Sequence, residues 1–354
     1  MKRVAVAMSG GVDSSVAAAL LTQQGYSVFG LMLRLWNEPG AETENRCCTP
    51  DDMALARRVA AQIGIPFYAL DARQLFYDTV VRNLLDGYTQ NTTPNPCLVC
   101  NRHLRWGFLL QHALSLGAEA LATGHYARLQ TDENEQVHLL RAVDCRKDQS
   151  YVLHLLNQEQ LRHTLLPLGE YTKPQVRQIA RQMGLPVSER PDSQDLCFLG
   201  QSDLHSFLLR HAPTTANPGP ILDRRGSCLG EHRGLAFYTI GQRKGLGIAA
   251  PQPLYVLAKD PLQNALIVGP QDELGQSELL ACQANWISGQ PPQAPFRAQV
   301  KIRYKASEAW GQVTPEPGGC FRVQFEHALR DITPGQAAVI FDGEACLGGG
   351  IISG

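Results

Sequence analysis

A glycine-rich loop between an apolar run and a helical segment constrains the fold of this chain more than any other feature. Residues 4–8 form a continuous apolar run, as expected for a strand buried on both faces, and residues 14–24 have a helical composition that ends at Gly25. Between them lies Ser9-Gly10-Gly11-Val12-Asp13-Ser14-Ser15. Two glycines let the backbone bend so that N–H groups face an anion, and the helix adds the positive end of its dipole. We therefore predict a strand, a phosphate-binding loop and a helix at the start of the chain.

The residues of this loop restrict its chemistry. It contains no lysine of the Walker type, and its glycine spacing does not fit a dinucleotide fingerprint. The hydroxyls of Ser9, Ser14 and Ser15 are further hydrogen-bonding groups, and Asp13 can hold Mg²⁺ against the phosphates. A glycine-rich turn with an N-cap serine would explain the two glycines alone, but not the whole heptapeptide.

Strand and helix signals alternate through the first 200 residues. Strands are predicted at 26–35, 66–70 and 118–123, and helices at 49–64, 75–88 and 101–116. Thr49-Pro50-Asp51-Asp52 has the order of a helix start, with threonine as N-cap, proline next and an acid at the third position. This rhythm predicts an α/β domain with a doubly wound parallel sheet, and a functional site at the carboxyl ends of the strands.

The pattern changes after about residue 210. Two segments rich in proline, 213–220 and 290–295, separate short β-like runs at 235–240, 254–257, 265–268, 296–304, 320–325 and 337–341. We predict two small β-rich domains, each similar to a barrel or sandwich. The predicted domains are 1–210, 211–280 and 281–354.

Composition limits the compartment and the partners. The apolar run after Met1 is too short for a signal peptide, and no run has transmembrane length, so we expect a cytoplasmic protein without a membrane partner. The formal net charge is −1, so nucleic acid would have to bind local basic patches. Three clusters of basic residues are candidates: Lys173, Arg177 and Arg181 on one helix face, Arg243-Lys244, and Arg297, Lys301, Arg303 and Lys305 around Tyr304. Each cluster can also be an ordinary solvated surface.

Two of the ten cysteines have the surroundings of reactive thiols. Cys100 lies near a predicted helix start, where the dipole favours the thiolate, and Cys197 follows the polar turn 191–194. Sulfur transfer needs such a pair, because one thiol carries the sulfur as a persulfide and the other releases it. The spacing of Cys97 and Cys100 also suits half of a zinc site, although no second pair with that spacing exists. Core or incidental positions are predicted for Cys47, Cys48, Cys145, Cys228, Cys282, Cys320 and Cys346, and a disulfide framework is not expected.

Motifs spread over the whole chain closely resemble those of the tRNA-specific 2-thiouridylases, which are PP-loop ATP pyrophosphatases. They are Ala7 to Ser14, Thr93-Pro94-Asn95-Pro96, Cys100-Asn101, Ala122 to Tyr126, Lys147 to Tyr151, Cys197-Phe198, Thr239 to Gly247, Arg303-Tyr304 and Thr333 to Gln336. The resemblance implies a tRNA-uridine 2-sulfurtransferase. Such an enzyme uses ATP to adenylate the C2 oxygen of the anticodon wobble uridine and replaces it with sulfur from a cysteine persulfide.

The resemblance also implies a role for each matching residue. Cys100 would be the nucleophile and Cys197 the persulfide carrier, and the two could form a disulfide. The ATP site would comprise Ala7, Met8, Ser9, Gly10, Gly11, Val12, Asp13, Ser14, Leu33 and Gly124. The target base would contact Asn95, Pro96 and Cys97, and the rest of the tRNA would contact His125, Lys147, Asp148, Gln149, Arg303, Tyr304 and Gln336. The implied partners are tRNA and a persulfide donor, either a cysteine desulfurase or a sulfur relay protein.

One residue departs from the family pattern. Many members carry aspartate where this chain has Cys97, so three thiols are available in place of two. Cys97, Cys100 and Cys197 could instead hold an iron–sulfur cluster that delivers sulfide.

Two other classes of function are consistent with parts of the sequence. A ligase similar to argininosuccinate synthetase would keep the nucleotide loop but would not need the cysteine pair. An RNA-binding β module with a degenerate nucleotide fold would not turn over ATP.

Overall fold

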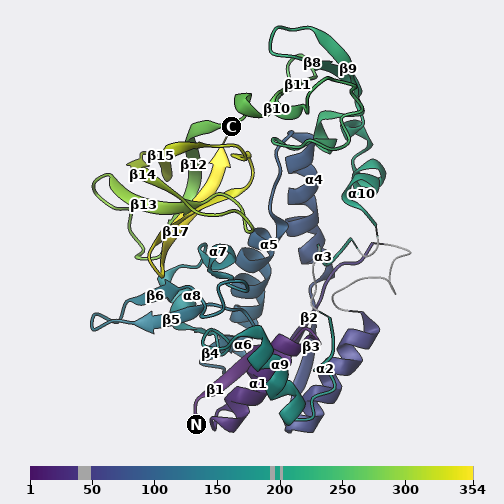
Figure 1. The fold of residues 1–354 in the computed structure, drawn as a ribbon. Helices are drawn as coiled ribbons and strands as arrows, with labels where there is room; N and C mark the ends of the chain where they lie inside the picture. Colours follow the sequence, from purple (N-terminus) through teal and green to yellow (C-terminus); the bar gives the residue numbers. More distant parts are fainter. Residues whose placement is uncertain (39–48, 192–195, 200–201, 354) are drawn as a thin grey trace.

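The computed structural model describes residues 1–38, 49–191, 196–199 and 202–353. It contains an α/β domain, a four-stranded sheet and a β-barrel (Figure 1). The α/β domain lies at the bottom of the view, the barrel at upper left and the four-stranded sheet at upper right. In the described part of the chain, no helix has the length and apolar character needed to cross a membrane.

A parallel five-stranded sheet forms the centre of the α/β domain, in the order β3-β2-β1-β4-β7. Its strands are β1 (Arg3–Ala7), β2 (Ser27–Arg34), β3 (Phe67–Asp71), β4 (Ala120–Ala122) and β7 (Thr164–Leu165). Val4 and Val6 of β1 enter one apolar cluster and Ala5 enters another, so the strand is buried on both faces. The prediction of a doubly wound parallel sheet is confirmed.

Helices cover both faces of this sheet. One face carries α1 (Val12–Gln23), α2 (Pro50–Ile63) and α9 (Lys173–Gln182). The other carries two long helical segments, each with a stretch of π-type hydrogen bonding: α3 (Arg73–Phe76) with η1 (Tyr77–Val81) and α4 (Arg82–Thr89), and α5 (Pro96–Val99) with η2 (Cys100–Leu109) and α6 (Leu110–Ser115). The short helices α7 (Ser150–Leu153) and α8 (Gln158–Arg162) lie between this domain and the barrel.

Local capping interactions predict where the helices begin, except that one helix begins five residues earlier than predicted. Thr49 accepts a hydrogen bond from the Asp52 N–H, and the Asp52 carboxylate accepts one from the Thr49 N–H, which confirms the capping box. The helix predicted from residue 101 begins instead at Pro96, because the Asn95 side chain caps it by accepting from the Cys97 N–H. Cys97 and Cys100 are therefore in the first turns of a helix and not in a loop before it.

The middle region combines a helix and a small sheet in the order β10-β11-β8-β9. It contains α10 (Leu204–His211), η3 (Pro213–Thr215), β8 (Gly219–Leu222), β9 (Cys228–His232), η4 (Leu235–Phe237), β10 (Tyr255–Asp260), β11 (Ala265–Gly269) and η5 (Gln271–Glu273). The strand predicted at 235–240 is wrong. Leu235 enters the core of this sheet from a 3₁₀ turn and Tyr238 from the residue that follows that turn, so their apolar character reflects packing and not a strand.

The C-terminal strands close into a six-stranded barrel, because β12 pairs with both β15 and β17. They are β12 (Gln276–Trp286), β13 (Phe296–Lys301), β14 (Ala309–Glu316), β15 (Cys320–Leu329), β16 (Ala337–Asp342) and β17 (Ala345–Ser353). A hairpin from the α/β domain, β5 (Arg128–Thr131) and β6 (Val137–Leu140), extends the barrel sheet through β17. The predicted β-rich character is confirmed, whereas the predicted domain boundaries stay a prediction.

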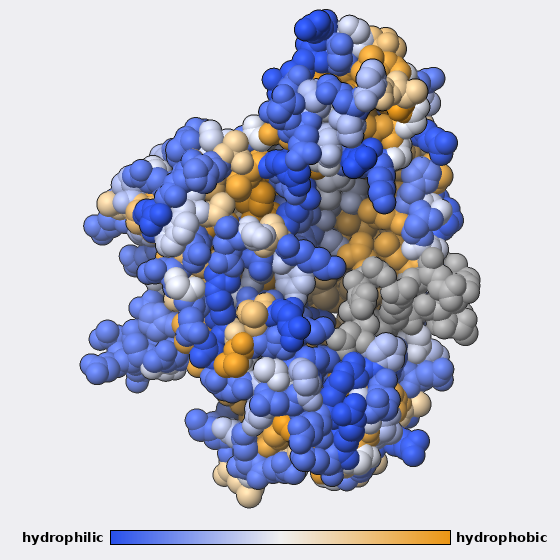
Figure 2. Space-filling view, viewed as in Figure 1, coloured by the Kyte–Doolittle hydropathy of each residue, from blue (hydrophilic) through white to orange (hydrophobic). Residues whose placement is uncertain are grey.

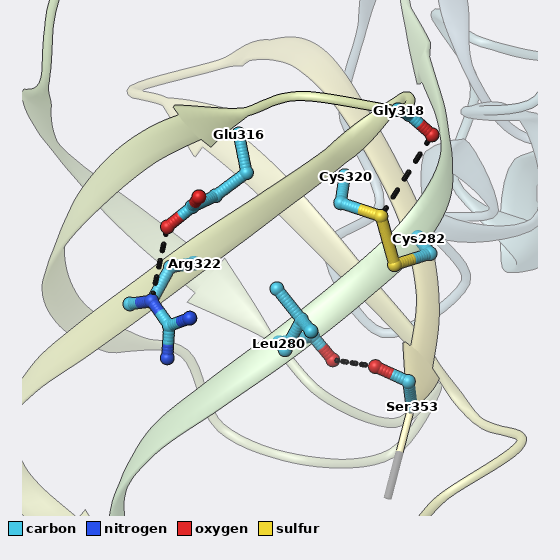
Figure 3. Close-up of a disulfide and its surroundings, with 7 residues drawn as sticks. All are labelled: Leu280, Cys282, Glu316, Gly318, Cys320, Arg322 and Ser353. Atoms are coloured by element: carbon cyan, nitrogen blue, oxygen red, sulfur yellow. Dashed lines mark hydrogen bonds and ion pairs between the residues drawn. A yellow bond between two sulfur atoms is a disulfide. The ribbon is translucent and has the colours of Figure 1, made fainter.

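A disulfide joins Cys282 to Cys320 in the barrel, contrary to the core positions predicted for both (Figure 3). The next cross-strand pair is Ala281 with Phe321, so the register of β12 and β15 brings the two cysteines opposite each other. The prediction was wrong because strand register cannot be read from cysteine spacing. Cys145 and Cys228 are exposed, which also corrects their predicted core positions, and Cys346 is buried as predicted. Cys47, Cys48 and most of the predicted turn 191–194 lie outside the described residues.

Candidate functional site

A cavity of about 540 Å³ opens at the carboxyl ends of β1, β2 and β4. Its wall combines the predicted nucleotide loop, one predicted catalytic cysteine and residues from distant segments. The lining residues are Ala7, Met8, Ser9, Gly11, Val12, Asp13, Ser14, Leu31, Leu33, Leu35, Cys100, Arg105, Leu109, Gly124, His125, Tyr126, Arg146, Lys147, Gln149, Lys173, Arg190, Pro191, Tyr304 and Lys305. Figure 2 shows that this side of the molecule is hollowed above the α/β domain, with apolar side chains along part of the hollow.

The nucleotide loop is held by its own hydroxyls and by a close backbone contact. Ser14 Oγ accepts from the Ser9 N–H and donates to the Gly11 carbonyl, so it shapes the turn before α1. Gly10 has φ +73°, and a Cβ there would lie 2.6 Å from the Asp52 carbonyl oxygen. A side chain at this position would therefore push α2 away from the loop. Gly11 is the N-cap of α1, which leaves the first N–H groups of the helix available to an anion.

The turn after β4 lies directly against this loop. A Cβ on Gly124 would be 2.7 Å from the Ser14 nitrogen and 2.8 Å from the Asp13 carbonyl carbon. Glycine is thus required here for the approach of two backbone segments, whatever else it contacts. Leu33, at the end of β2, lies on the same cavity wall.

Asp13 is already engaged by two groups in the described structure. Lys173 Nζ lies 2.8 Å from each carboxylate oxygen, and the Tyr126 hydroxyl donates to one of them at 2.7 Å. Magnesium in nucleotide sites is held by one or two carboxylates together with substrate phosphates, so Asp13 is a suitable donor for it. Because both oxygens accept from Lys173, a metal would have to displace the ammonium.

Arg190 ties the loop to the start of α2. Its guanidinium donates to the Gly10 carbonyl at 3.0 Å and forms an ion pair with Asp52, which is buried. The same carboxylate completes the capping box of α2, so helix cap and loop position depend on one another.

A hydrogen-bond chain behind Cys100 fixes a cation in the cavity. Arg105 donates to the Asn101 side-chain oxygen and lies 3.0 Å from His125 Nε2. An arginine can only donate, so Nε2 accepts and the imidazole proton is on Nδ1, which donates to Thr123 Oγ1 at 2.8 Å. Burial and the charge of Arg105 hold the pKa of His125 well below its usual value, in agreement with a neutral ring.

The barrel contributes Tyr304 and Lys305 to the cavity wall. The Tyr304 ring lies 6.1 Å from that of Tyr151, whose hydroxyl donates to the Ala337 carbonyl. Burial, together with the charges of Asp148 and Cys97, raises the pKa of Tyr304. An aromatic side chain with 37% exposure in this wall is available to stack on a base.

Several residues predicted to contact tRNA make internal contacts. Gln336 donates to the Thr93 carbonyl at 2.7 Å, and the Thr93 N–H donates to the Pro334 carbonyl, so a barrel loop holds the segment before Asn95. Asp148 is buried and accepts from Ala142 and Ser150. Gln149 accepts from the Tyr126 N–H.

The predicted basic face on α9 is wrong. Lys173 points into the cavity, Arg177 donates to the Ser188 carbonyl, and Arg181 pairs with Glu189 at 2.7 Å. In the first turn of α9, Lys173 and Val176 are buried while Pro174 and Gln175 are exposed, so Lys173 does not share a solvent-facing surface with Arg181. In the barrel, Arg303 contacts Thr333, Asp331 and the Ile240 carbonyl, which joins the barrel to the middle region.

The structure places the three candidate thiols differently. Cys100 is partly buried in the cavity wall, Cys97 is exposed, and Cys197 is partly buried against the same apolar cluster as Cys100. Within the described residues, no three His, Cys, Asp or Glu side chains lie close enough together to hold a metal ion. Delivery of sulfur by a cluster held by Cys97, Cys100 and Cys197 stays a prediction, since the three thiols are not gathered into a metal site in the described structure.

Comparison with known proteins assigns the family. Residues 2–201 match a model described as a tRNA methyl transferase HUP domain, 205–270 a PRC-barrel domain and 276–352 an aminomethyltransferase beta-barrel domain. The whole chain aligns at 46% identity with tRNA-specific 2-thiouridylase MnmA of Chloroflexus aggregans and covers 99% of it. The chain belongs to the tRNA-specific 2-thiouridylase family. Enzymes of that name from Moorella thermoacetica and Clostridioides difficile are 48% and 43% identical, each covered over 98% of its length.

Among the polar residues that line the cavity of this 2-thiouridylase family member, sequence reasoning did not single out Arg105, Tyr126, Arg146 or Arg190, and it assigned Lys173 to a basic surface instead. Arg105 had a usable signal, since it follows Cys100 by five residues in one predicted helix. Tyr126 belongs to the motif Ala122 to Tyr126, but no role of its own was predicted for it. Lys173 and Arg190 contact the loop from more than 150 residues away, and no local sequence pattern predicts such contacts.

Proposed function

We propose that this chain is a tRNA-uridine 2-sulfurtransferase that adenylates the C2 oxygen of the anticodon wobble uridine and replaces that oxygen with sulfur from a cysteine persulfide. One observation carries the proposal: a single cavity is lined by the anion-binding loop and by Cys100. A uridine flipped out of its stack into this cavity would meet a nucleotide on one side and a thiol on the other.

In the first step, ATP binds with its phosphates at the loop and at the first N–H groups of α1. The C2 oxygen of uridine attacks the α-phosphorus, the α–β anhydride bond breaks, and pyrophosphate leaves with the bonding electron pair. Mg²⁺ held by Asp13 would offset phosphate charge. Arg105, fixed by Asn101 and His125, is a cation already ordered at this site.

In the second step, Cys197 carries the sulfur as a persulfide supplied by a donor protein. The terminal sulfur attacks C2 and AMP leaves. The Cys100 thiolate then attacks the Cys197 sulfur, which breaks the S–S bond and leaves the terminal sulfur on the base. The product is a Cys100–Cys197 disulfide, which a thiol reductant must reopen before the next cycle.

The tRNA contacts are also part of the proposal. Lys147, Tyr304 and Lys305 line the open wall and would meet the anticodon loop directly. Asn95, Pro96 and Cys97 would hold the base from the start of the helix. His125, Asp148, Gln149 and Gln336 would act on tRNA through the segments they support, and Arg303 through the position of Tyr304. We place the reaction in the cytoplasm, where tRNA is available.

Loss of either relay thiol tests this function. Cys100→Ser and Cys197→Ser should each eliminate 2-thiouridine, measured by mass spectrometry of digested tRNA, because the relay has no redundancy. Cys228→Ser, which changes an exposed thiol outside the cavity, is the matched control and should keep normal activity. Thiolation by either relay mutant at the normal rate would contradict the proposal.

Product analysis separates the alternatives. Sulfur in the base with AMP and pyrophosphate supports the 2-thiouridylase reaction, whereas a methylated base would support the methyl transferase description of the first domain. Delivery by an iron–sulfur cluster would require activity to follow iron content in anaerobic preparations. Full activity of an iron-free preparation supplied with Mg²⁺ excludes it.

A further inference from the structure

A lysine from a distant helix occupies the nucleotide loop, which has no lysine of its own. Lys173 is the first residue of α9, and its ammonium contacts both oxygens of Asp13 at 2.8 Å. It also lies over the Tyr126 ring, 5.9 Å from the centroid, and its side chain is only 10% exposed. All three residues line the cavity that contains the loop.

The backbone of Lys173 is held firmly in place. Its N–H donates to the Asp144 carboxylate at 3.0 Å, and a capping box at Thr172 starts the helix. Further along α9, Val176 and Ala180 are completely buried in the cluster shared with α1. The base of the side chain is therefore fixed, while its four-carbon stem leaves the ammonium able to move by a few ångströms.

The charges near the loop indicate that the contact between Lys173 and Asp13 has a role in nucleotide binding as well as in stability. A partly buried lysine–carboxylate pair is weak evidence for stability, because desolvation offsets much of the attraction. Phosphates entering the loop would be repelled by the negative charge of Asp13. A neighbouring ammonium removes that repulsion and can itself bind phosphate oxygens.

We propose that Lys173 is the exchangeable cation of the nucleotide loop. Without nucleotide it neutralises Asp13; when a magnesium nucleotide binds, the ammonium transfers to the phosphates and the Asp13 oxygens become available to the metal. This inference rests on the proposed ATP-dependent function. As the α–β anhydride breaks and the electron pair passes to pyrophosphate, the ammonium stabilises the added charge. Lys173 donates hydrogen bonds throughout and transfers no proton.

Metal binding without nucleotide tests the exchange directly. Mn²⁺ binding would be followed by electron paramagnetic resonance in the whole chain, the Lys173→Met variant and the Lys173→Met/Asp13→Asn double variant. With the competing ammonium removed, Lys173→Met should bind Mn²⁺ at least about tenfold more tightly than the unchanged chain. The double variant should lose that gain, because the carboxylate is its source.

Turnover provides the second readout. Lys173→Met should lower tRNA-dependent exchange of pyrophosphate into ATP by about 10²–10³-fold, the usual effect of losing one preorganised donor. Lys173→Arg should recover part of it, and Arg181→Met, on the same helix but exposed and paired with Glu189, should leave it unchanged.

Two results would overturn the inference: Mn²⁺ affinity in Lys173→Met equal to that of the unchanged chain, or normal pyrophosphate exchange in that variant. Circular dichroism and the unfolding midpoint establish that each variant is folded. If Lys173→Met does not fold, full exchange activity in Lys173→Arg without any change in nucleotide affinity would refute a specific ammonium. Absence of exchange in the unchanged chain would refute the proposed function instead, while the Mn²⁺ comparison would still decide the role of Lys173.

Discussion

Two adjacent glycines in the nucleotide loop should respond differently to substitution by alanine. Gly10 has φ +73°, and a Cβ there would lie 2.6 Å from the Asp52 carbonyl oxygen and 3.2 Å from the carbonyl carbon. Gly11 has φ −87° and ψ 163°, which any residue adopts, and its added Cβ would meet only Ser9 Oγ at 3.4 Å. We expect Gly10→Ala to destabilise the domain and Gly11→Ala to leave its stability intact.

The magnitude follows from two costs. A left-handed conformation costs an alanine roughly 1–2 kcal/mol relative to glycine. Overpacking against a backbone that belongs to a capped helix adds about 1–3 kcal/mol. Gly10→Ala should therefore lower the free energy of unfolding by about 2–5 kcal/mol. Gly11→Ala restricts the unfolded chain but places alanine at an N-cap, where glycine is preferred, so the two effects oppose each other and that free energy should change by less than about 1 kcal/mol.

Hydrogen exchange of the β1 and α1 amides is the suitable assay, because a chain with several folded units has no single unfolding free energy. Nucleotide affinity, measured separately, should fall in both variants, since phosphates approach the loop backbone closely. Equal stability of Gly10→Ala and the unchanged chain would refute the assigned backbone contact. A loss in Gly11→Ala as large as in Gly10→Ala would refute it as well.

Other residues give independent predictions. Burial lowers the pKa of His154 to about 4, so between pH 6.5 and 4 the unfolded chain takes up a proton that the folded chain does not. The free energy of unfolding, measured by urea denaturation, should therefore fall by on the order of 3 kcal/mol between pH 6.5 and 4. His154→Gln should remove most of this fall. Cys346 is buried in the core, so Cys346→Ala should cost about 1–2 kcal/mol in thermal unfolding; because burial raises the pKa of its thiol to about 12, the change should not slow thiolation. Reduction of Cys282–Cys320, which are 38 residues apart, should destabilise the barrel by about 4 kcal/mol, measured by exchange of the β12 amides; an unchanged value would contradict a stabilising bond. Lys305→Ala should reduce the salt dependence of tRNA binding by about one unit of log–log slope, and a slope equal to that of the unchanged chain would argue against a phosphate contact.

Local interactions account for what was predictable in the fold. The β1 strand, the loop and α1 follow from an apolar run, two glycines and a helix N-terminus within about 20 residues. The capping box at Thr49 and Asp52 forms between residues three apart, so sequence alone defines it. The helix that begins at Pro96 was predicted to begin five residues later, because Asn95 and Pro96 were assigned to a loop. An asparagine N-cap followed by proline is also a good helix start.

Long-range pairing accounts for what was not predictable. Hairpin β5–β6 belongs to the first part of the chain, yet its register with β17 adds it to the barrel. The Cys282–Cys320 bond depends on the pairing of β12 with β15, which spacing does not reveal. The strand predicted at 235–240 failed because tertiary packing can bury apolar residues from a turn as well as from a strand.

The amino-acid sequence by itself determined which groups this protein can use: an anion-binding loop, a thiol at a helix start and a second thiol far along the chain. Their local geometry depends on backbone preferences and neighbouring side chains, which sequence encodes directly. Only the tertiary structure decided which charges surround them. Lys173 and Arg190 reach the loop across 160 and 180 residues, and Tyr304 reaches the cavity from the barrel. Such contacts arise because helix and strand packing brings distant segments to the same end of the sheet, and no pattern along the chain encodes that meeting.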